Sequence, residues 1–335
     1  MHRRESFWYR ACGMSIEADA PIAGGRRIES RELADVCVAM HGADSAPDVP
    51  TTTPAWYVSP YQDEHGVPSL TIRLVGSSNL FCYGEGARFL VSASGSRIDA
   101  WWDSPLTDAD AADFLLSGVL SFVVRLRGLV PLHASAVVID GTAVLFAGAA
   151  GAGKSSTAAA FATLGLPVLS DDMVTMADED GVVIAHPASP RVSVWPDSAE
   201  GLFAGQSLPA HSAVYAKHRL DLLEHGYRFH ERPAPVRAIF VLQDRLGSSA
   251  SPATRVLTSG AALMSLVTHT FGNYLLDESM RAREFDVLGR IAETVPVREL
   301  AFAPGLELLV PNCQRLLGEL QSRNGVGSHF SCFVK

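Results

Sequence analysis

The sequence predicts an α/β fold in which a small β-rich N-terminal unit precedes a larger domain of alternating strands and helices. In the first 105 residues, short apolar or alternating runs such as TIRLVG (71–76) are separated by Gly, Pro, Ser and Asp clusters, as is typical of strands and turns. From residue 129 onward, strand patterns alternate with helical patterns, which favours a layered architecture. One of these strands runs directly into a glycine-rich loop and then a helix. We therefore divide the chain into a β-rich unit, a connecting helix, an α/β domain and a tail: 1–105, 106–128, 129–322 and 323–335.

The composition is that of an ordinary globular protein. Of its 335 residues, 47% are hydrophobic and 19% are charged, which suits one large or two modest domains. The formal net charge of −9 argues against nucleic acid as a partner, because such binding needs a basic surface. The five scattered cysteines contain no CxxC pair, which favours reduced thiols over a disulfide framework or a zinc site.

No segment predicts secretion or insertion into a membrane. The opening residues, MHRRESFWYRACGM, contain arginines but no apolar stretch after them, unlike a secretory signal. The longest apolar stretch, 114–124, is too short to span a bilayer and is followed by Arg125. We expect a cytoplasmic protein without a membrane partner.

The connecting segment predicts a buried helix. Thr107 can cap its N-terminus, Asp110 lies in its first turn, Arg125 near its end suits the helix dipole, and Gly128 stops it. The middle of this helix is strongly apolar, so we expect it to lie between the two halves of the chain.

A hairpin is predicted at the start of the α/β domain. The runs SAVVID (135–140) and TAVLFAG (142–148) flank Asp140-Gly141, a dipeptide that favours a two-residue turn. After the glycine-rich loop we predict a helix over 154–164, ended by Gly165. The elements expected after it are a strand, another strand, two helices and two further β-like runs: 168–170, 236–242, 261–276, 281–293, 297–302 and 306–310.

The glycine-rich loop fits the phosphate-binding pattern G-x-x-x-x-G-K-[ST] at every fixed position. Its glycines let successive backbone N–H groups point at phosphate oxygens, and the following helix adds its positive dipole end. Lys154 would meet the β- and γ-phosphates, and Ser155 would offer a hydroxyl to Mg²⁺. The alternative is a Gly/Ala-rich turn that happens to precede a lysine. The sequence thus predicts ATP and Mg²⁺ as cofactors, bound by Gly148, Ala149, Ala150, Gly151, Ala152, Gly153, Lys154, Ser155 and Ser156.

Two aspartates and a histidine are candidate catalytic residues. Asp171 and Asp172 end the strand after the P-loop helix, and ligands of open α/β sheets gather at the carboxyl ends of strands. One carboxylate would hold Mg²⁺ with Ser155, and the other would accept a proton from an attacking hydroxyl. Alone, such a pair is more often a solvated loop or a helix cap. His133 precedes the hairpin, where it is either a core residue or a catalytic neighbour.

Three segments, LHASAVVIDG, GAAGAGKSS and VLSDDMV, resemble the catalytic domain of the HPr kinase/phosphorylase family. That family has a histidine, a P-loop and an Asp-Asp pair in this order, and the spacings here are similar: 15 residues from His133 to Gly148 and 23 from Gly148 to Asp171. The resemblance implies a P-loop kinase fold related to phosphoenolpyruvate carboxykinases, which phosphorylates serine on a protein or peptide. It implies that Asp172 is the proton acceptor, that His133 and Lys154 are its active-site partners, and that Ser155 is a metal ligand.

The chain departs from that family after the aspartates. Where the family has a glycine-containing signature with an acidic metal ligand, this chain has PRVSVWPDS (190–198), in which Asp197 is the candidate replacement. The family also needs a cation near the transferred phosphoryl group, and Lys217 or Arg219 would supply it unless this basic cluster is only a solvated turn. The opening YRACGMSIEADAPI and the RVSVWPD segment look closer to the HPr-kinase-like proteins of peptide-modification clusters. Some of those resemble kinases that phosphorylate a serine on a lasso-peptide precursor.

Three functions remain open at this point. The first is a serine kinase whose partner is a serine-bearing peptide or small protein. The second is a phosphotransferase that acts on a small molecule, and the third is a regulatory ATP-binding module without transfer activity. The absence of an NKxD-like element leaves guanine specificity without support. The sequence does not fix the acceptor, and it leaves a homo-oligomer open.

Overall fold

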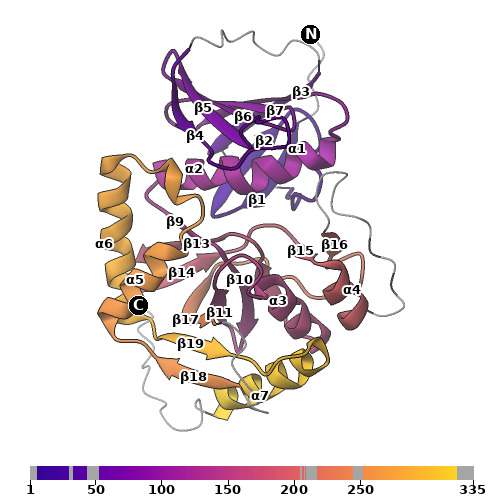
Figure 1. The fold of residues 1–335 in the computed structure, drawn as a ribbon, viewed down its shortest axis with the longest axis vertical. Helices are drawn as coiled ribbons and strands as arrows, with labels where there is room; N and C mark the ends of the chain where they lie inside the picture. The colour runs from indigo at the N-terminus through magenta and orange to yellow at the C-terminus, as the bar shows by residue number, and fades with distance from the viewer. Residues whose placement is uncertain are drawn as a thin grey trace.

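The computed structural model describes residues 6–29, 33–43, 53–203, 206, 208, 217–243 and 252–322. The expected tail, 323–335, lies outside this part of the chain. The described residues form a mixed α/β structure with two large sheets and a layer of helix between them (Figure 1). No helix of the described part is both long and apolar enough to cross a membrane.

The N-terminal strands form one eight-stranded sheet in the order β1-β2-β3-β8-β7-β6-β5-β4. Along β7 the buried and half-buried residues alternate, because one face of the sheet packs on the connecting helix and the other does not. Both Trp101 and Trp102 are largely buried on β8, as packing residues. The strands are β1 Phe7–Ala11, β2 Met14–Ala18, β3 Val36–Gly42, β4 Ala55–Val58, β5 Leu70–Val75, β6 Ser78–Tyr83, β7 Ala87–Val91 and β8 Arg97–Trp102.

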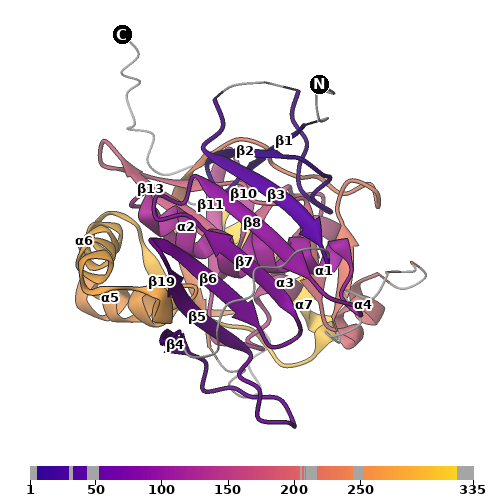
Figure 2. The same cartoon turned by 90° about the horizontal axis from the view of Figure 1, so that it is seen from above.

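The connecting segment is helical, as predicted, but it is not one regular α-helix. Thr107 caps α1 (Asp108–Phe114) in a reciprocal capping box with Asp110. A π-helical turn, η1 (Leu115–Val119), then leads into α2 (Leu120–Leu126). Gly118 lies in this turn, and a Cβ there would come within 2.3 Å of the Tyr83 hydroxyl, so the absent side chain admits the tyrosine. Figure 2 shows this helical layer beneath the N-terminal sheet, which confirms its expected burial between the two halves.

The second sheet has nine strands and is covered by helices on both faces. Its main path is β12-β10-β11-β17-β14-β13-β9, and β19 joins β17 to β18. Helices α3 (Lys154–Thr163) and α7 (Leu309–Ser322) share one hydrophobic core with β10 and β11. Helices α5 (Ser259–Thr268) and α6 (Glu278–Thr294) share the core on the opposite face. Its strands are β9 Val130–Leu132, β10 Ala134–Ile139, β11 Thr142–Ala147, β12 Val168–Ser170, β13 Val174–Glu179, β14 Val182–His186, β17 Ala234–Leu242, β18 Ala253–Val256 and β19 Val297–Ala301.

A separate hairpin and the remaining helices complete the described chain. The hairpin consists of β15 (Arg191–Val194) and β16 (His218–Asp221). The helices are α3 Lys154–Thr163, α4 Pro196–Leu202, α5 Ser259–Thr268, η2 Asn273–Leu275, α6 Glu278–Thr294, η3 Leu306–Leu308 and α7 Leu309–Ser322.

Most expected elements of this domain are confirmed, and two are corrected. The β10–β11 hairpin turns at Asp140 and Gly141 with φ of 51° and 77°, the left-handed values of the predicted tight turn. The run 306–310 is not a strand. It forms η3 and the start of α7, because a short apolar run fits a buried strand and a buried helix equally well. The helix expected over 261–276 ends at Thr268, and the chain then turns at Gly272, where φ is 61°.

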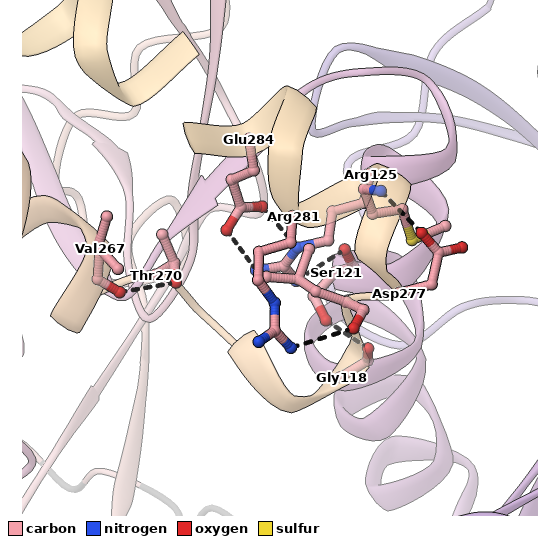
Figure 3. A network of polar contacts seen from close by, with 10 residues as sticks. Gly118, Ser121, Arg125, Val267, Thr270, Asp277, Arg281 and Glu284 are labelled. Atoms are coloured by element: carbon pink, nitrogen blue, oxygen red, sulfur yellow. Dashed lines mark hydrogen bonds and ion pairs between the residues drawn. The ribbon is translucent and has the colours of Figure 1, made fainter. Parts of the chain in front are cut away.

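A buried ion pair joins the helical layer to the α/β domain. Arg125 of α2 donates from Nε to Oε2 of Glu284 on α6 at 2.7 Å (Figure 3). Their side chains are only 2% and 6% exposed. Arg125 also donates to the backbone carbonyl of Ser121, so its charge is both paired and hydrogen-bonded. This pair therefore links α2 directly to α6.

Candidate active site

The P-loop connects β11 to α3 with a backbone that only glycine tolerates well. Gly148, Gly151 and Gly153 have φ of 151°, 82° and 96°. A Cβ at Gly148 would lie 3.2 Å from the carbonyl oxygen of Leu242 on the neighbouring strand. Gly153 is the N-cap of α3 and provides no side-chain cap, so the first N–H groups of the helix remain available as donors. The loop therefore has the backbone and the free donors that a phosphate group requires.

Lys154 lies at the start of α3 with its ammonium group turned onto the loop. Its Nζ donates to the carbonyl oxygens of Gly148 at 3.0 Å and Ala149 at 2.9 Å. Burial lowers the pKa of Lys154, whereas the nearby charges of Asp172 and Asp171 oppose that shift. The ammonium is thus desolvated and held over the loop. A flexible four-carbon stem allows it to meet a phosphate there.

Asp171 is fixed by two donors from different elements. The Ser135 hydroxyl of β10 donates to Oδ1 at 2.5 Å, and the Ser193 backbone N–H of β15 donates to Oδ2 at 2.9 Å. Each carboxylate oxygen can accept a second bond or ligate a metal. These two hydrogen bonds fix the orientation of Asp171 at the carboxyl end of β12, beside the β10–β11 hairpin that leads into the P-loop.

Asp172 adopts a left-handed backbone conformation, with φ of 68°, that turns it toward His133. The His133 Nδ1 lies 3.0 Å from the backbone oxygen of Asp172 and 3.5 Å from its carboxylate oxygen Oδ1. Burial raises the pKa of the Asp172 carboxyl, the charge of Asp171 raises it further, and His133, Lys217 and Lys154 act in the opposite direction. The Asp172 side chain is nonetheless 44% exposed, so the carboxylate can reach a ligand.

His133 is the residue at which the chain passes from β9, paired with β13, to β10, paired with β12. Its backbone N–H donates to the His269 carbonyl at 2.8 Å, and its ring packs on Phe271. Burial lowers the pKa of His133 below its usual value, although Asp172 opposes this. A neutral imidazole with the proton on Nδ1 donates to the Asp172 carbonyl, so the ring position matches a role in orienting Asp172.

The hairpin β15–β16 brings the predicted basic residues to the same site. Lys217 lies 5.5 Å over the Trp195 ring and is close enough to affect the pKa of both Lys154 and Asp172. Arg219 is instead held by an ion pair with Asp113 of α1. Of the two predicted cations, Lys217 is therefore the one that faces the P-loop lysine and the aspartate pair.

Asp197 does not lie with the aspartate pair. It is exposed in the first turn of α4, although the neighbouring Ser198 hydroxyl contacts the Ser156 hydroxyl of α3 at 2.8 Å. The segment 190–198 thus contacts the P-loop helix through Ser198. The role of Asp197 as a metal ligand stays a prediction.

A cavity of about 330 Å³ opens beside the aspartate pair, between the α/β domain and the N-terminal unit. Both carboxylates line it, and so do basic residues of the β15–β16 hairpin and apolar residues of the N-terminal unit. Sequence reasoning missed Ser135, Ser193, Asp113 and Arg191. Ser135 occurs in LHASAV, and Arg191 and Ser193 occur in PRVSVWPDS, so the motif segments contained three of the four. Asp113 is brought in only by the tertiary fold. The residues that line the cavity include Cys12, Asp113, Phe114, Leu116, Asp171, Asp172, Arg191, Ser193, Trp195, Lys217 and Arg219.

The residues present suit Mg²⁺ bound together with a nucleotide better than a metal held by protein alone. In the part of the chain that is described, no group of three or more His, Cys, Asp or Glu side chains is placed to hold a metal ion. Mg²⁺ usually takes one or two protein oxygens and completes its shell with phosphates and water. The Ser155 hydroxyl and the fixed Asp171 carboxylate provide such oxygens.

No protein-family model and no curated protein matches the chain. Among solved structures, the HPr(Ser) kinase/phosphatase from Coxiella burnetii matches it at 17% sequence identity. That match covers 58% of this chain and 98% of the other, with a TM-score of 0.32. A similarity at this level carries no inference about activity, so the function is argued below from the site residues.

Proposed function

We propose that the protein is an ATP-dependent kinase that transfers the γ-phosphoryl group to a serine hydroxyl of a peptide or small protein. In this proposal residues 129–322 are a P-loop kinase domain of the HPr kinase/phosphoenolpyruvate carboxykinase type, and the β-rich unit 1–105 precedes it. The single observation that carries the proposal is the convergence of the P-loop lysine with an aspartate whose pKa is raised. Lys154 and Asp172 each affect the ionisation of the other, and Asp172 faces a cavity large enough for an acceptor.

The P-loop residues would bind the nucleotide. The backbone N–H groups of Gly148–Ser155 surround the phosphates, and Lys154 pairs with the β- and γ-phosphate oxygens. Ser155 and Asp171 would hold a Mg²⁺ ion, which would supply positive charge that neutralises the phosphates. Lys217, which lines the cavity with the aspartate pair, would stabilise charge on the transferred group.

Asp172 would act as the general base. The acceptor hydroxyl gives its proton to the Asp172 carboxylate while its oxygen forms a bond to the γ-phosphorus and the bond to the ADP oxygen breaks. A carboxylate with a raised pKa accepts a proton more readily than an ordinary one. His133 holds the backbone of Asp172 and is a positioning residue.

The test compares Asp172→Asn with Asp286→Asn, which changes an exposed carboxylate on α6. We expect Asp172→Asn to bind MgATP with nearly unchanged affinity and to lose transfer to serine peptides by on the order of 100- to 10,000-fold. Asp286→Asn should retain both properties. Undiminished transfer by Asp172→Asn would remove Asp172 from the mechanism.

A second candidate is a phosphotransferase that acts on a small molecule. It is favoured by the cavity volume of about 330 Å³, which is small for a peptide segment. Hydroxylated metabolites assayed beside serine peptides separate the two functions, because only one panel should release ADP in proportion to phosphorylated product. A regulatory ATP-binding module would give neither product.

A further inference from the structure

We propose that Arg191 and Arg219 form a binding site for a carboxylate of the acceptor, one or two residues from the serine that is phosphorylated. This inference rests on the proposed kinase function and names a feature of its substrate. It assigns the specificity of the cavity to a pair of arginines that the transfer chemistry itself does not use.

The two guanidinium groups share a single aspartate. Arg219 donates from Nη2 to Oδ2 of Asp113, and Arg191 Nη1 lies 3.6 Å from Oδ1 of the same residue. The Arg191 and Arg219 side chains are 15% and 12% exposed, so both charges are largely removed from water. Among these three side chains the formal charge is +1, because two guanidiniums face one carboxylate.

Several donors of this pair have no acceptor. Within the described part of the chain, Nε and Nη1 of Arg191 and Nε of Arg219 are buried without a hydrogen-bond partner. Burial, together with the adjacent charge of Arg219, lowers the pKa of Arg191, whereas Asp113, Asp221 and Glu224 oppose that shift. A buried charged donor without a partner costs free energy that a bound anion would recover.

The strand register places this pair next to the reacting groups. Ser193 lies opposite Arg219 in the β15–β16 hairpin, and its N–H holds Asp171. Arg191 and Ser193 share a face of β15, since side chains two apart point the same way, about 7 Å from each other. The valines between and after them face the core against α3. Because the Ser193 N–H binds Asp171, the two arginines lie next to the aspartate pair, in the lining of the same cavity.

A monoanion fits the pair better than a phosphate does. The formal charge of +1 is neutralised by one carboxylate, and the planar fork of a guanidinium matches a carboxylate in two parallel hydrogen bonds. A phosphate dianion would bring twice that negative charge into a cavity whose lining has three carboxylates and three cations: Asp113, Asp171, Asp172, Arg191, Lys217 and Arg219. The shared chemistry, a carboxylate, comes either from a chain terminus or from an Asp or Glu side chain of the acceptor.

The connecting helical segment and the turn at Cys12 form the opposite wall and limit what can accompany the carboxylate. Phe114 and Leu116 give that wall an apolar surface. The turn at Cys12 is docked onto the α/β domain by a bond from its N–H to the Pro187 carbonyl at 2.8 Å. A cavity of about 330 Å³ lies at the low end for ligand sites, so it admits a residue or two rather than a long segment.

The experiment uses the full chain, radiolabelled ATP and degenerate peptide libraries in which one serine is fixed. Each library is made with a free terminal carboxylate after the serine or as the amide, and with Glu, Gln or Lys fixed beside the serine. For the unmodified protein we expect kcat/KM to be on the order of 10- to 100-fold higher when a carboxylate is present in either position. The two kinds of library decide whether the terminal or the side-chain carboxylate is the ligand.

The variants Arg191→Gln and Arg219→Gln should lose that preference through a higher KM, with MgATP affinity unchanged. Arg255→Gln is the matched control, because Arg255 pairs with Glu299 on an exposed strand and should keep the preference. Arg219→Glu should move the preference toward the lysine libraries, a gain that a misfolded variant cannot show.

The possible failures are distinct. Equal phosphorylation of carboxylate, amide and lysine libraries, unaltered in Arg191→Gln and Arg219→Gln, would overturn the carboxylate site and leave the kinase intact. If no library is phosphorylated while MgATP is bound, the peptide kinase and the carboxylate site both fall.

Discussion

The imidazole Nδ1 of His133 lies 3.0 Å from the backbone oxygen of Asp172, a residue whose φ of 68° is in the left-handed region. A non-glycine residue in that region costs free energy, so the contact helps to hold a backbone that would otherwise relax. The histidine that precedes the P-loop strand therefore fixes where the candidate base points. In this proposal His133 affects catalysis by positioning Asp172.

The first prediction concerns this contact. His133→Ala removes the donor, and we expect kcat to fall on the order of 10- to 100-fold because Asp172 is misplaced, with MgATP affinity retained. His133→Asn keeps an N–H near the position of Nδ1 and should recover most of the rate. If Ala and Asn variants lose the same activity, the hydrogen bond to Asp172 is not what matters.

The second prediction follows from the raised pKa of Asp172. The raised pKa means that the Asp172 carboxyl holds its proton more tightly in the folded protein than in the unfolded chain. The free energy of unfolding therefore decreases as the pH rises through the folded pKa of Asp172 and the carboxyl ionises. Asp172→Asn should therefore raise the thermal unfolding temperature at pH 7. That gain should shrink as the pH falls toward the ordinary aspartate pKa of about 3.9.

Thermal unfolding of Asp286→Asn, measured across the same pH range, controls for general effects of removing a negative charge. If Asp172→Asn raises the unfolding temperature equally at pH 4 and pH 7, that result would contradict a raised pKa of Asp172. In the unmodified enzyme, the acidic limb of kcat/KM should lie above the pH expected for an ordinary aspartate.

The third prediction addresses the buried pair of Arg125 and Glu284. Removing one partner, as in Glu284→Gln, leaves a desolvated guanidinium and should lower the free energy of unfolding by about 3–5 kcal/mol in urea titrations. The double variant Arg125→Met with Glu284→Leu should be close to the unmodified protein in stability. Equal stability of the single and unmodified proteins would show that the pair is not desolvated in solution.

Local patterns were enough to predict the elements that carry the candidate phosphate site. The hairpin turn at Asp140-Gly141, the loop before Lys154 and the short strand before Asp171 each depend on a few adjacent residues, so their chemistry is visible in the sequence. The expected strand at 306–310 was wrong because nothing local separates a short apolar strand from the first turn of a buried helix.

The cavity could not be predicted from local patterns. Asp113 comes from a helix that the sequence identified only as a buried connector, and it meets Arg219 from 106 residues away. The donors that fix Asp171 come from two further elements. These contacts depend on the order of the strands in the sheet and on the packing of the N-terminal unit. The hydrophobic periodicity of a single segment encodes neither.

The most direct test of the account is equilibrium binding of MgATP to the purified chain, measured by calorimetry beside Lys154→Ala. We predict a dissociation constant in the range of about 1 μM to 1 mM for the unmodified protein and a loss of at least roughly 10-fold in the variant, because one charged partner of the phosphates is gone. No measurable affinity in the unmodified protein, or the same affinity in Lys154→Ala, would contradict a phosphate-binding loop at 148–155.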